Sequence, residues 1–212
     1  SGGKVLLSYW KQGGELNDYV YEDENGEETK LSVFPDAFFS LDVEGKGRAH
    51  YMLEYDRSTE SVKKRIREKF LAYAIYTNHK LYRRKYFYAK RPTGDTELFI
   101  REKLWDDLTD FERDKILENG IKGIRILFLT KATQPDSDLI TKGKQPQRLR
   151  QQNLINAVQR IPALRDKDGK VSTTRFWFAS EVDFNLEDPT SIFNNYWVSS
   201  KQGDPKRYSI RE

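Results

Sequence analysis

The 212-residue sequence contains no cysteine, one methionine and two histidines. Without cysteine the chain can form no disulfide, offers no thiolate nucleophile and cannot hold zinc or an iron-sulfur cluster through sulfur. This absence favours a reducing compartment, so we expect a cytoplasmic protein. No stretch approaches the roughly 18 consecutive apolar residues that span a bilayer, and the N-terminus lacks the layout of a signal peptide. We therefore expect a chain that is neither membrane-spanning nor secreted.

Two kinds of catalytic machinery are disfavoured by missing motifs. His50 and His79 are the only histidines, and a predicted strand and helix separate them. The histidine pair that holds the metal in tyrosine-dependent relaxases is therefore absent, although twelve tyrosines leave a tyrosine nucleophile formally possible. Gly120 and Gly123 are not followed by Lys and Ser or Thr at the spacing of a phosphate-binding loop. ATP hydrolysis is not expected.

The length and composition favour one folded domain. The mean hydropathy is −0.82 and a third of the residues are charged, yet aromatic residues make up 13% of the chain, which is more than a disordered polar chain carries. Ser1, Gly2 and Gly3 are typical of an expression scar left by protease cleavage. We expect residues 4–212 to form a single domain from a longer protein.

The modest net charge of +4 is unevenly distributed. An acidic stretch covers residues 15–28, whereas twelve basic residues against two acidic ones lie between Arg57 and Arg91. A solvated helix face is the simpler explanation, but the aromatic residues interleaved over residues 80–91 favour a surface for phosphates and stacked bases. The residues that we predict to contact nucleic acid are Arg57, Lys63, Lys64, Arg67, Arg83, Arg84, Lys85, Lys90 and Arg91. Core packing on a strand explains Tyr86 and Tyr88 equally well.

A second basic cluster is predicted further along the chain, where it could contact a phosphate backbone. It consists of Lys142, Lys144, Arg148 and Arg150, around Gly143.

Hydrophobic periodicity and turn signals predict a mixed α/β fold, with a mixed central sheet flanked by helices. Thr109 to Glu112 matches a capping box, and Gly120 would stop the helix that follows it. The predicted helices cover residues 5–11, 58–77, 109–120 and 147–161. The predicted strands are a hairpin within residues 19–34, paired strands at 36–43 and 48–56, and buried strands at 123–129 and 176–179.

Three carboxylates are predicted to lie together on the paired strands. Glu54 and Asp56 stand two residues apart, so they point to the same face of a strand, and Asp36 begins the preceding strand. Pairing through the turn at residues 44–47 brings the start of the first strand beside the end of the second. Such acids repel one another unless a cation compensates, and oxygen ligands suit Mg²⁺ or Mn²⁺. The alternatives are that Asp56 caps a helix and that Glu54 pairs with an arginine.

These segments resemble the replication-relaxation family of bacterial plasmids and mobile elements. The resemblance rests on residues 33–39, 52–60 and 69–73, and extends to the strands at 126–130 and 176–179. The pattern also resembles the PD-(D/E)XK, restriction-endonuclease-like core, in which an aspartate on one strand and an acidic-x-lysine pair on the next hold a metal. Members of the family commonly carry an N-terminal winged-helix domain, which would precede this chain.

The sequence departs from the nuclease pattern at one position. Asp56 stands where the motif has its lysine, and Lys69 on the following helix would take that role by analogy. The resemblance implies catalytic roles for Asp36, Glu54, Asp56 and Lys69, with the three acids as ligands of Mg²⁺ or Mn²⁺. We therefore expect a DNA-binding domain of a replication or mobilisation protein, acting as a metal-dependent endonuclease or nickase.

The alternatives are a catalytically inactive nuclease-like DNA-binding module and a protein-interaction module whose acidic residues 15–28 dock a basic partner. The pattern predicts no oligomeric state.

Overall fold

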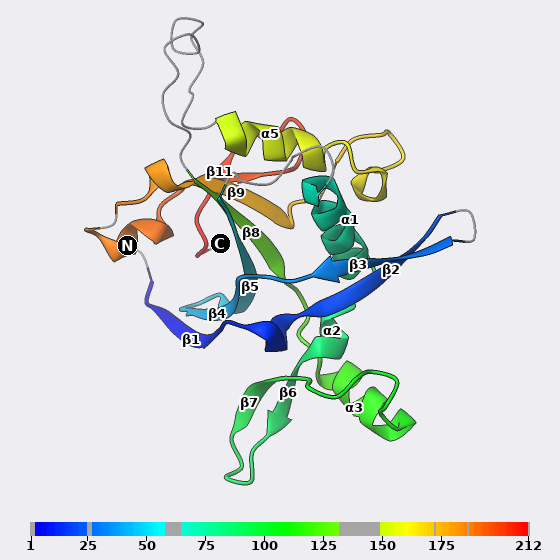
Figure 1. The fold of residues 1–212 in the computed structure, drawn as a ribbon. Helices are drawn as coiled ribbons and strands as arrows, with labels where there is room; N and C mark the ends of the chain where they lie inside the picture. The colour runs from blue at the N-terminus through cyan, green and yellow to red at the C-terminus, as the bar shows by residue number, and fades with distance from the viewer. Residues whose placement is uncertain are drawn as a thin grey trace, which may run out of the picture.

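A seven-stranded mixed sheet forms the centre of the computed structural model, which describes residues 3–24, 27–57, 65–131, 149–171, 173–185 and 187–211 (Figure 1). In spatial order the strands are β1 (Val5–Lys11), β4 (Ala37–Val43), β5 (Gly47–Asp56), β8 (Arg125–Thr130), β9 (Phe176–Ser180), β10 (Trp197–Ser199) and β11 (Arg207–Tyr208). β4 runs antiparallel to both of its neighbours, whereas β5, β8 and β9 are mutually parallel. This arrangement confirms the predicted mixed α/β fold.

The helices α1 (Arg65–Asn78) and α5 (Leu149–Val158) cover one face of this sheet (Figure 1). Their apolar side chains pack on aromatic rings from β8 and β9. The ring of Phe70 on α1 lies 4.7 Å from that of Phe128 on β8, and Phe178 on β9 stacks on Phe128. The opposite face carries a second core around Trp177 and Trp197. No helix among the described residues combines the length and the apolar character needed to cross a bilayer.

Strand β5 contributes to both cores because its side chains alternate between the two faces of the sheet. Met52 belongs to the core beneath the helices, whereas Tyr51 belongs to the core on the other face. Glu54 and Asp56 have the same parity as Met52, so they point toward the helices. The prediction that Glu54 and Asp56 point to the same face of this strand is thus confirmed.

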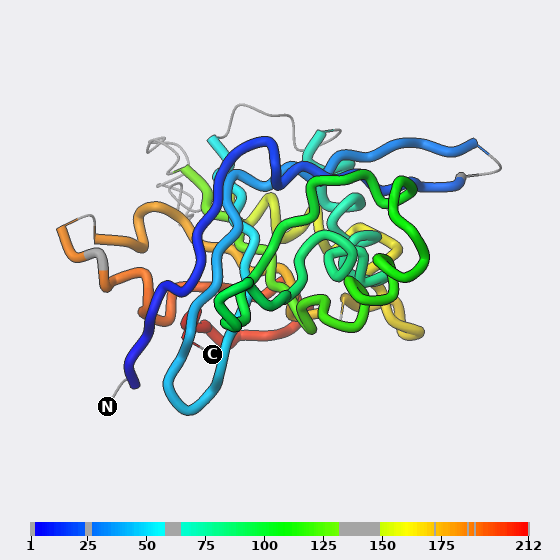
Figure 2. Tube along the Cα trace, turned by 90° about the horizontal axis from the view of Figure 1, so that it is seen from below, coloured from blue at the N-terminus to red at the C-terminus, as the bar shows by residue number. Residues whose placement is uncertain are grey.

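Two hairpins project from the body of the molecule. The acidic hairpin of β2 (Asp18–Glu24) and β3 (Glu27–Val33) extends away from the sheet in both views (Figures 1 and 2). The second hairpin joins β6 (Tyr86–Lys90) to β7 (Thr96–Ile100), next to the short helix α2 (Tyr82–Lys85). Because Tyr88 contacts His50 through its hydroxyl group, this second hairpin lies beside the first half of β5.

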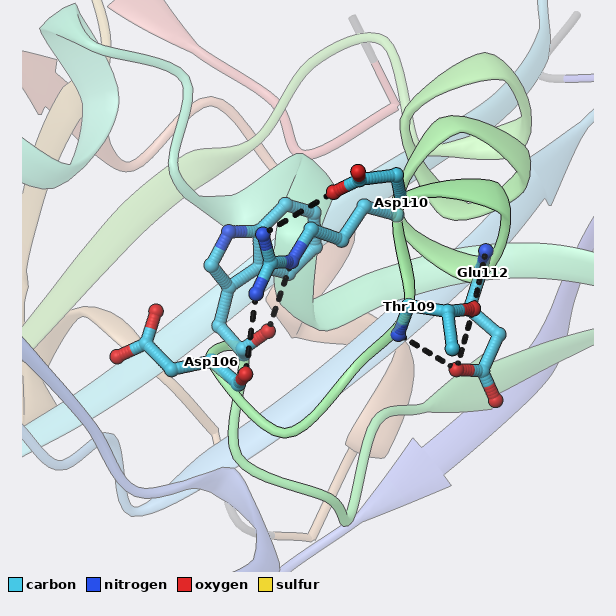
Figure 3. Close-up of polar contacts among 6 residues, drawn as sticks. Asp106, Thr109, Asp110 and Glu112 are labelled. Carbon is cyan, nitrogen blue, oxygen red and sulfur yellow. Dashed lines mark hydrogen bonds and ion pairs between the residues drawn. The ribbon is translucent and has the colours of Figure 1, made fainter.

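Helix α3 (Asp110–Asn119) begins with the predicted capping box (Figure 3). The Thr109 amide donates to the Glu112 carboxylate at 2.8 Å, and the Glu112 amide donates to the Thr109 hydroxyl at 3.3 Å. Two amides that have no partner within the helix are thereby satisfied. Gly120 ends the helix, as predicted, with extended backbone angles.

The largest error in the predicted fold is at the N-terminus. Residues 5–11 were predicted to be helical but form β1, which pairs antiparallel with β4. A bulge between Leu7 and Tyr9 shifts the register and breaks the simple alternation of a strand. Pairing with β4 therefore outweighs the weak local preference for a helix. The strands β7, β10 and β11 were not predicted, and β6 was predicted only as the alternative in which Tyr86 and Tyr88 pack on a strand.

Gly120 provides a test of the packing between α2 and α3. A Cβ atom at this position would lie 2.7 Å from the Arg83 carbonyl oxygen and 2.8 Å from the Arg83 Cβ. We expect Gly120→Ala to lower the free energy of unfolding by about 1–3 kcal/mol, measured by urea denaturation, because the added methyl group overpacks the contact. Gly123→Ala is the matched control, since a Cβ there meets nothing within 4 Å. Equal stabilities of the two variants would contradict the packing.

Candidate functional site

The predicted acids lie where β4 begins and β5 ends. Ala37 pairs with Leu53 across the two strands, which places Asp36 beside Glu54 at the next position. Glu54 and Asp56 follow on the face that α1 and α5 cover. The expectation that Asp36 lies near the end of β5 is therefore met, although the side chain of Asp36 is exposed whereas Glu54 and Asp56 are buried.

Asp36 extends the hydrogen bonding between β4 and β5. Its amide donates to the Leu53 carbonyl at 2.9 Å, and its carboxylate accepts the Tyr55 amide at 2.7 Å. The side chain thus replaces a backbone acceptor at the point where Pro35 precedes the strand. Asp36 holds the end of the strand pair in place.

Glu54 is held between β5 and α1 by two partners on one side of the helix. Lys69 donates to one carboxylate oxygen at 2.9 Å, and the Tyr73 hydroxyl donates to the other. Lys69 and Tyr73 are four residues apart, so they occupy neighbouring turns of α1. Burial raises the pKa of Glu54, while the Lys69 charge and the hydrogen bonds from Lys69 and Tyr73 lower it, and the nearby Asp36 charge raises it further.

Asp56 is bound by an arginine from a distant part of the chain. The Arg150 guanidinium, in the first turn of α5, donates through Nε at 2.5 Å and through Nη2 at 2.9 Å to the two carboxylate oxygens. Both side chains are about nine-tenths buried or more. This forked pair fixes the start of α5 against the end of β5.

As they lie, the three acids do not fit a divalent cation. Both oxygens of Glu54 and both oxygens of Asp56 accept hydrogen bonds from protein donors. Within the part of the chain that the structure describes, no three histidine or carboxylate side chains are grouped closely enough to hold a metal ion. Mg²⁺ or Mn²⁺ would first have to displace Lys69 or Arg150. The predicted metal centre of Asp36, Glu54 and Asp56 is therefore not formed in this arrangement.

The basic residues from Arg57 to Arg91 do not form one continuous face, contrary to the prediction. Lys85 is buried, its ammonium donates to the Asn17 carbonyl at 3.1 Å, and burial lowers its pKa. Arg83 is half-buried and donates to the Leu117 carbonyl. Both side chains therefore link elements of the fold and do not offer their charge to a ligand.

The remaining predicted contact residues separate into two groups. Arg84 stacks over Trp105, 5.1 Å from the ring centroid, and Arg91 forms an ion pair with Glu97, so these two bases and Lys90 belong to the region of α2 and the second hairpin. Arg57 and Arg67 are exposed near the end of β5 and the start of α1. Lys63, Lys64, Lys142, Lys144 and Arg148 lie outside the described residues.

Two residues of the site were missed or misassigned by sequence reasoning. Tyr73 was not predicted to contact an acid, and its four-residue spacing from Lys69 is the signal that could have placed both against one carboxylate. Arg150 was assigned to a phosphate-binding cluster. It lies 94 residues from Asp56, and no local spacing indicates that pair.

The Lys69–Glu54 pair predicts how stability depends on pH. Because the native pKa of Glu54 is raised above the value of an unfolded chain, its contribution to stability is fully present below about pH 4.5 and is lost as the pH rises through the native pKa. Lys69→Met removes the charge that opposes this shift. We expect the variant to lose more stability than the wild type between pH 5 and 8, about 3 kcal/mol at the upper end, in urea denaturation.

The matched control is Lys103→Met, which removes a lysine from an exposed pair with Glu112. An exposed pair of this kind contributes little, so its stability should follow the wild-type pH profile. Adding Glu54→Gln to Lys69→Met should remove the extra pH dependence, since no carboxyl group is left to ionise. A Lys69→Met profile parallel to that of the wild type would show that Glu54 is not the responsible group.

No protein-family model, no curated protein and no solved structure matches this chain. Membership of the replication-relaxation family therefore stays a prediction, and so does the nuclease-like core. What the site can do has to be inferred from its own geometry.

Proposed function

We propose that this chain is a nucleic-acid-binding module whose nuclease-like core holds its buried acids in ion pairs. The observation that carries the proposal is the pairing of Glu54 with Lys69 and of Asp56 with Arg150. Buried carboxylates neutralised in this way present no negative field to an approaching phosphate backbone. The end of β5 is thereby compatible with an anionic partner.

Exposed bases surround these neutralised acids. Arg57 follows β5 directly, and Lys131 lies next to it because its amide donates to the Asp56 carbonyl at 2.9 Å. Arg65 lies one helical turn before Lys69 on the same side of α1. We call these three residues, Arg57, Arg65 and Lys131, the basic rim. Among the described residues no carboxylate forms an ion pair with any of them, so their charge is available to phosphates.

The rim gives a direct test of DNA binding. We expect the double variant Arg57→Gln, Arg65→Gln to bind a fluorescently labelled duplex more weakly in anisotropy titrations. Each phosphate contact that is lost should reduce the slope of log K against log salt concentration by about 0.9 for B-form DNA. The loss should be similar for unrelated sequences, because phosphate contacts do not read bases.

The matched control is Lys90→Gln, Arg91→Gln, which removes two charges from the second hairpin instead of the rim. Equal weakening by both double variants would mean that net charge alone governs the affinity, and the rim would lose its role. Wild-type protein that binds no DNA even at low salt would contradict the proposal. That outcome would favour the protein-interaction alternative through the acidic β2–β3 hairpin. DNA as partner and the cytoplasmic location stay predictions.

Metal-dependent cleavage is the second candidate, and one observation favours it. Lys69 contacts Glu54 from the helix that follows β5, which is where the resemblance to PD-(D/E)XK nucleases would require a displaced motif lysine. Asp36 stands beside them at the start of β4. Because the acids already have protein partners, we expect no cleavage of supercoiled plasmid above background with Mg²⁺ or Mn²⁺. Nicking by the wild type that is lost in Asp36→Ala would instead establish the nuclease.

A further inference from the structure

A pocket of about 700 Å³ lies at the opposite end of the sheet from Glu54. It is lined by the β4–β5 turn with the first residues of β5, by the segment between α3 and β8, and by residues just before β9. His50 and Tyr88 form part of the wall. The volume falls in the range of sites that hold a small molecule the size of a nucleotide. None of the residues assigned to the basic rim lines it.

The wall of this pocket is strongly basic. Among the described residues that line it, six are basic and one, Glu118, is acidic. The bases are Lys46, Arg48, Lys122, Arg125, Arg175 and Arg211. They come from four separate parts of the chain, so the concentration of charge is produced by the fold and is not visible as a run in the sequence. A concave surface lined by one sign of charge focuses its field on a counter-ion.

The carboxylates of the protein neutralise little of this charge. Arg48 is paired with Asp42 through two short hydrogen bonds. The other five bases form no ion pair with a carboxylate in the described part of the chain. A folded protein normally balances clustered cations with acids or with a bound anion.

Several of these bases are held in place by contacts that leave their charge unbalanced. The Arg125 guanidinium lies over Trp177, 4.2 Å from the ring centroid, and the Arg211 guanidinium lies 4.7 Å over Phe193. The Nε atom of Arg211 is buried, and no described residue forms a hydrogen bond with it. In the part of the chain that the structure describes, the Arg175 guanidinium donates only to the amide oxygen of Asn78, at 3.4 Å. Rings fix such guanidinium groups without neutralising them, so the pocket is preorganised for an anion.

His50 fixes part of the pocket wall without adding charge. Its ring nitrogens lie 2.8 Å from the Ser40 hydroxyl and 3.2 Å from the Tyr88 hydroxyl. Burial lowers the pKa of His50 to about 4, so the ring is neutral at physiological pH. The chain of hydroxyl and imidazole groups joins β4 and β5 to β6 and holds the Tyr88 ring at the wall.

We infer that this pocket binds a small polyanion carrying phosphate groups, through Lys122, Arg175 and the ring-stacked arginines. Guanidinium groups match phosphate oxygens in a forked geometry, and several of them around one cavity favour more than one phosphate group. The inference is independent of the basic rim, because the two surfaces lie at opposite ends of β5 and share no residue.

Isothermal titration calorimetry with inorganic tripolyphosphate tests the inference. We expect the wild-type protein to bind one equivalent, and Lys122→Gln and Arg175→Gln each to weaken the affinity by roughly tenfold, the effect of one lost charge-assisted contact. Lys122 is exposed and Arg175 is half-buried, and thermal unfolding checks that each variant folds. Lys90→Gln, outside the pocket, is the matched control and should bind like the wild type.

Absence of binding, or equal affinities of the wild type and the two pocket variants, would overturn the site. A second titration identifies the source of the phosphate groups, with a single-stranded oligonucleotide carrying either a 5′-phosphate or a 5′-hydroxyl. Binding that needs the 5′-phosphate and is weakened by Arg175→Gln assigns the pocket to a strand end. Binding of tripolyphosphate with no preference between the oligonucleotides assigns it to a free polyphosphate compound. If the basic-rim variants bound duplex DNA as tightly as the wild type, the proposed function would be contradicted, but neither of these two titration results would change.

Discussion

The arrangement of α1 and β5 depends on the contacts that the helix makes with the Glu54 carboxylate, which is almost completely removed from water. An ionised group at this depth is tolerated only if charge and hydrogen bonds compensate it. Lys69 and Tyr73 supply both from successive turns of one helix, so α1 can take only one position along the strand. Phe70 on the same helix then packs against the aromatic rings of β8 and β9 in a single register.

Asp56 and Arg150 repeat this arrangement for the second helix. Two buried ion pairs thus attach the two helices that cover the sheet to the end of one strand, β5. Pairs of this kind add little net stability compared with apolar residues, but removing one partner is costly, so they select one packing arrangement over its alternatives. In this protein the acids that resemble a catalytic cluster act as attachment points. The same pairs leave the end of β5 without net negative charge from its buried residues.

Much of the core could be predicted from the sequence, because its signals are local. The parity of Glu54 and Asp56 follows from the alternation of a strand, the turn that joins β4 to β5 from its turn residues, and β8 from its nearly continuous apolar run. Residues 5–11 could not be assigned correctly, because their strand exists only through pairing with β4. The short strands β10 and β11 likewise depend on partners elsewhere in the chain.

The site was predictable as a set of acids but not as a set of pairs. Spacing brings Asp36, Glu54 and Asp56 together, yet it says nothing of Arg150, which approaches from far along the chain. A run of basic residues in the sequence does not show which of its side chains are exposed, since Lys85 is buried whereas its neighbour Arg84 is exposed. The basic pocket shows the converse, because its six bases form no run at all. Charge density in three dimensions is a property of the fold.

The bulge in β1 has a consequence for how copies of this protein meet one another. β1 is an edge strand that carries the exposed side chains of Leu6, Leu7 and Trp10. An apolar edge strand of this kind can pair with a strand of another chain. The shift between Leu7 and Tyr9 divides its free edge into two runs of three residues, neither long enough for a stable added strand. The bulge thus protects an exposed, apolar edge strand against edge-to-edge association between copies of the protein.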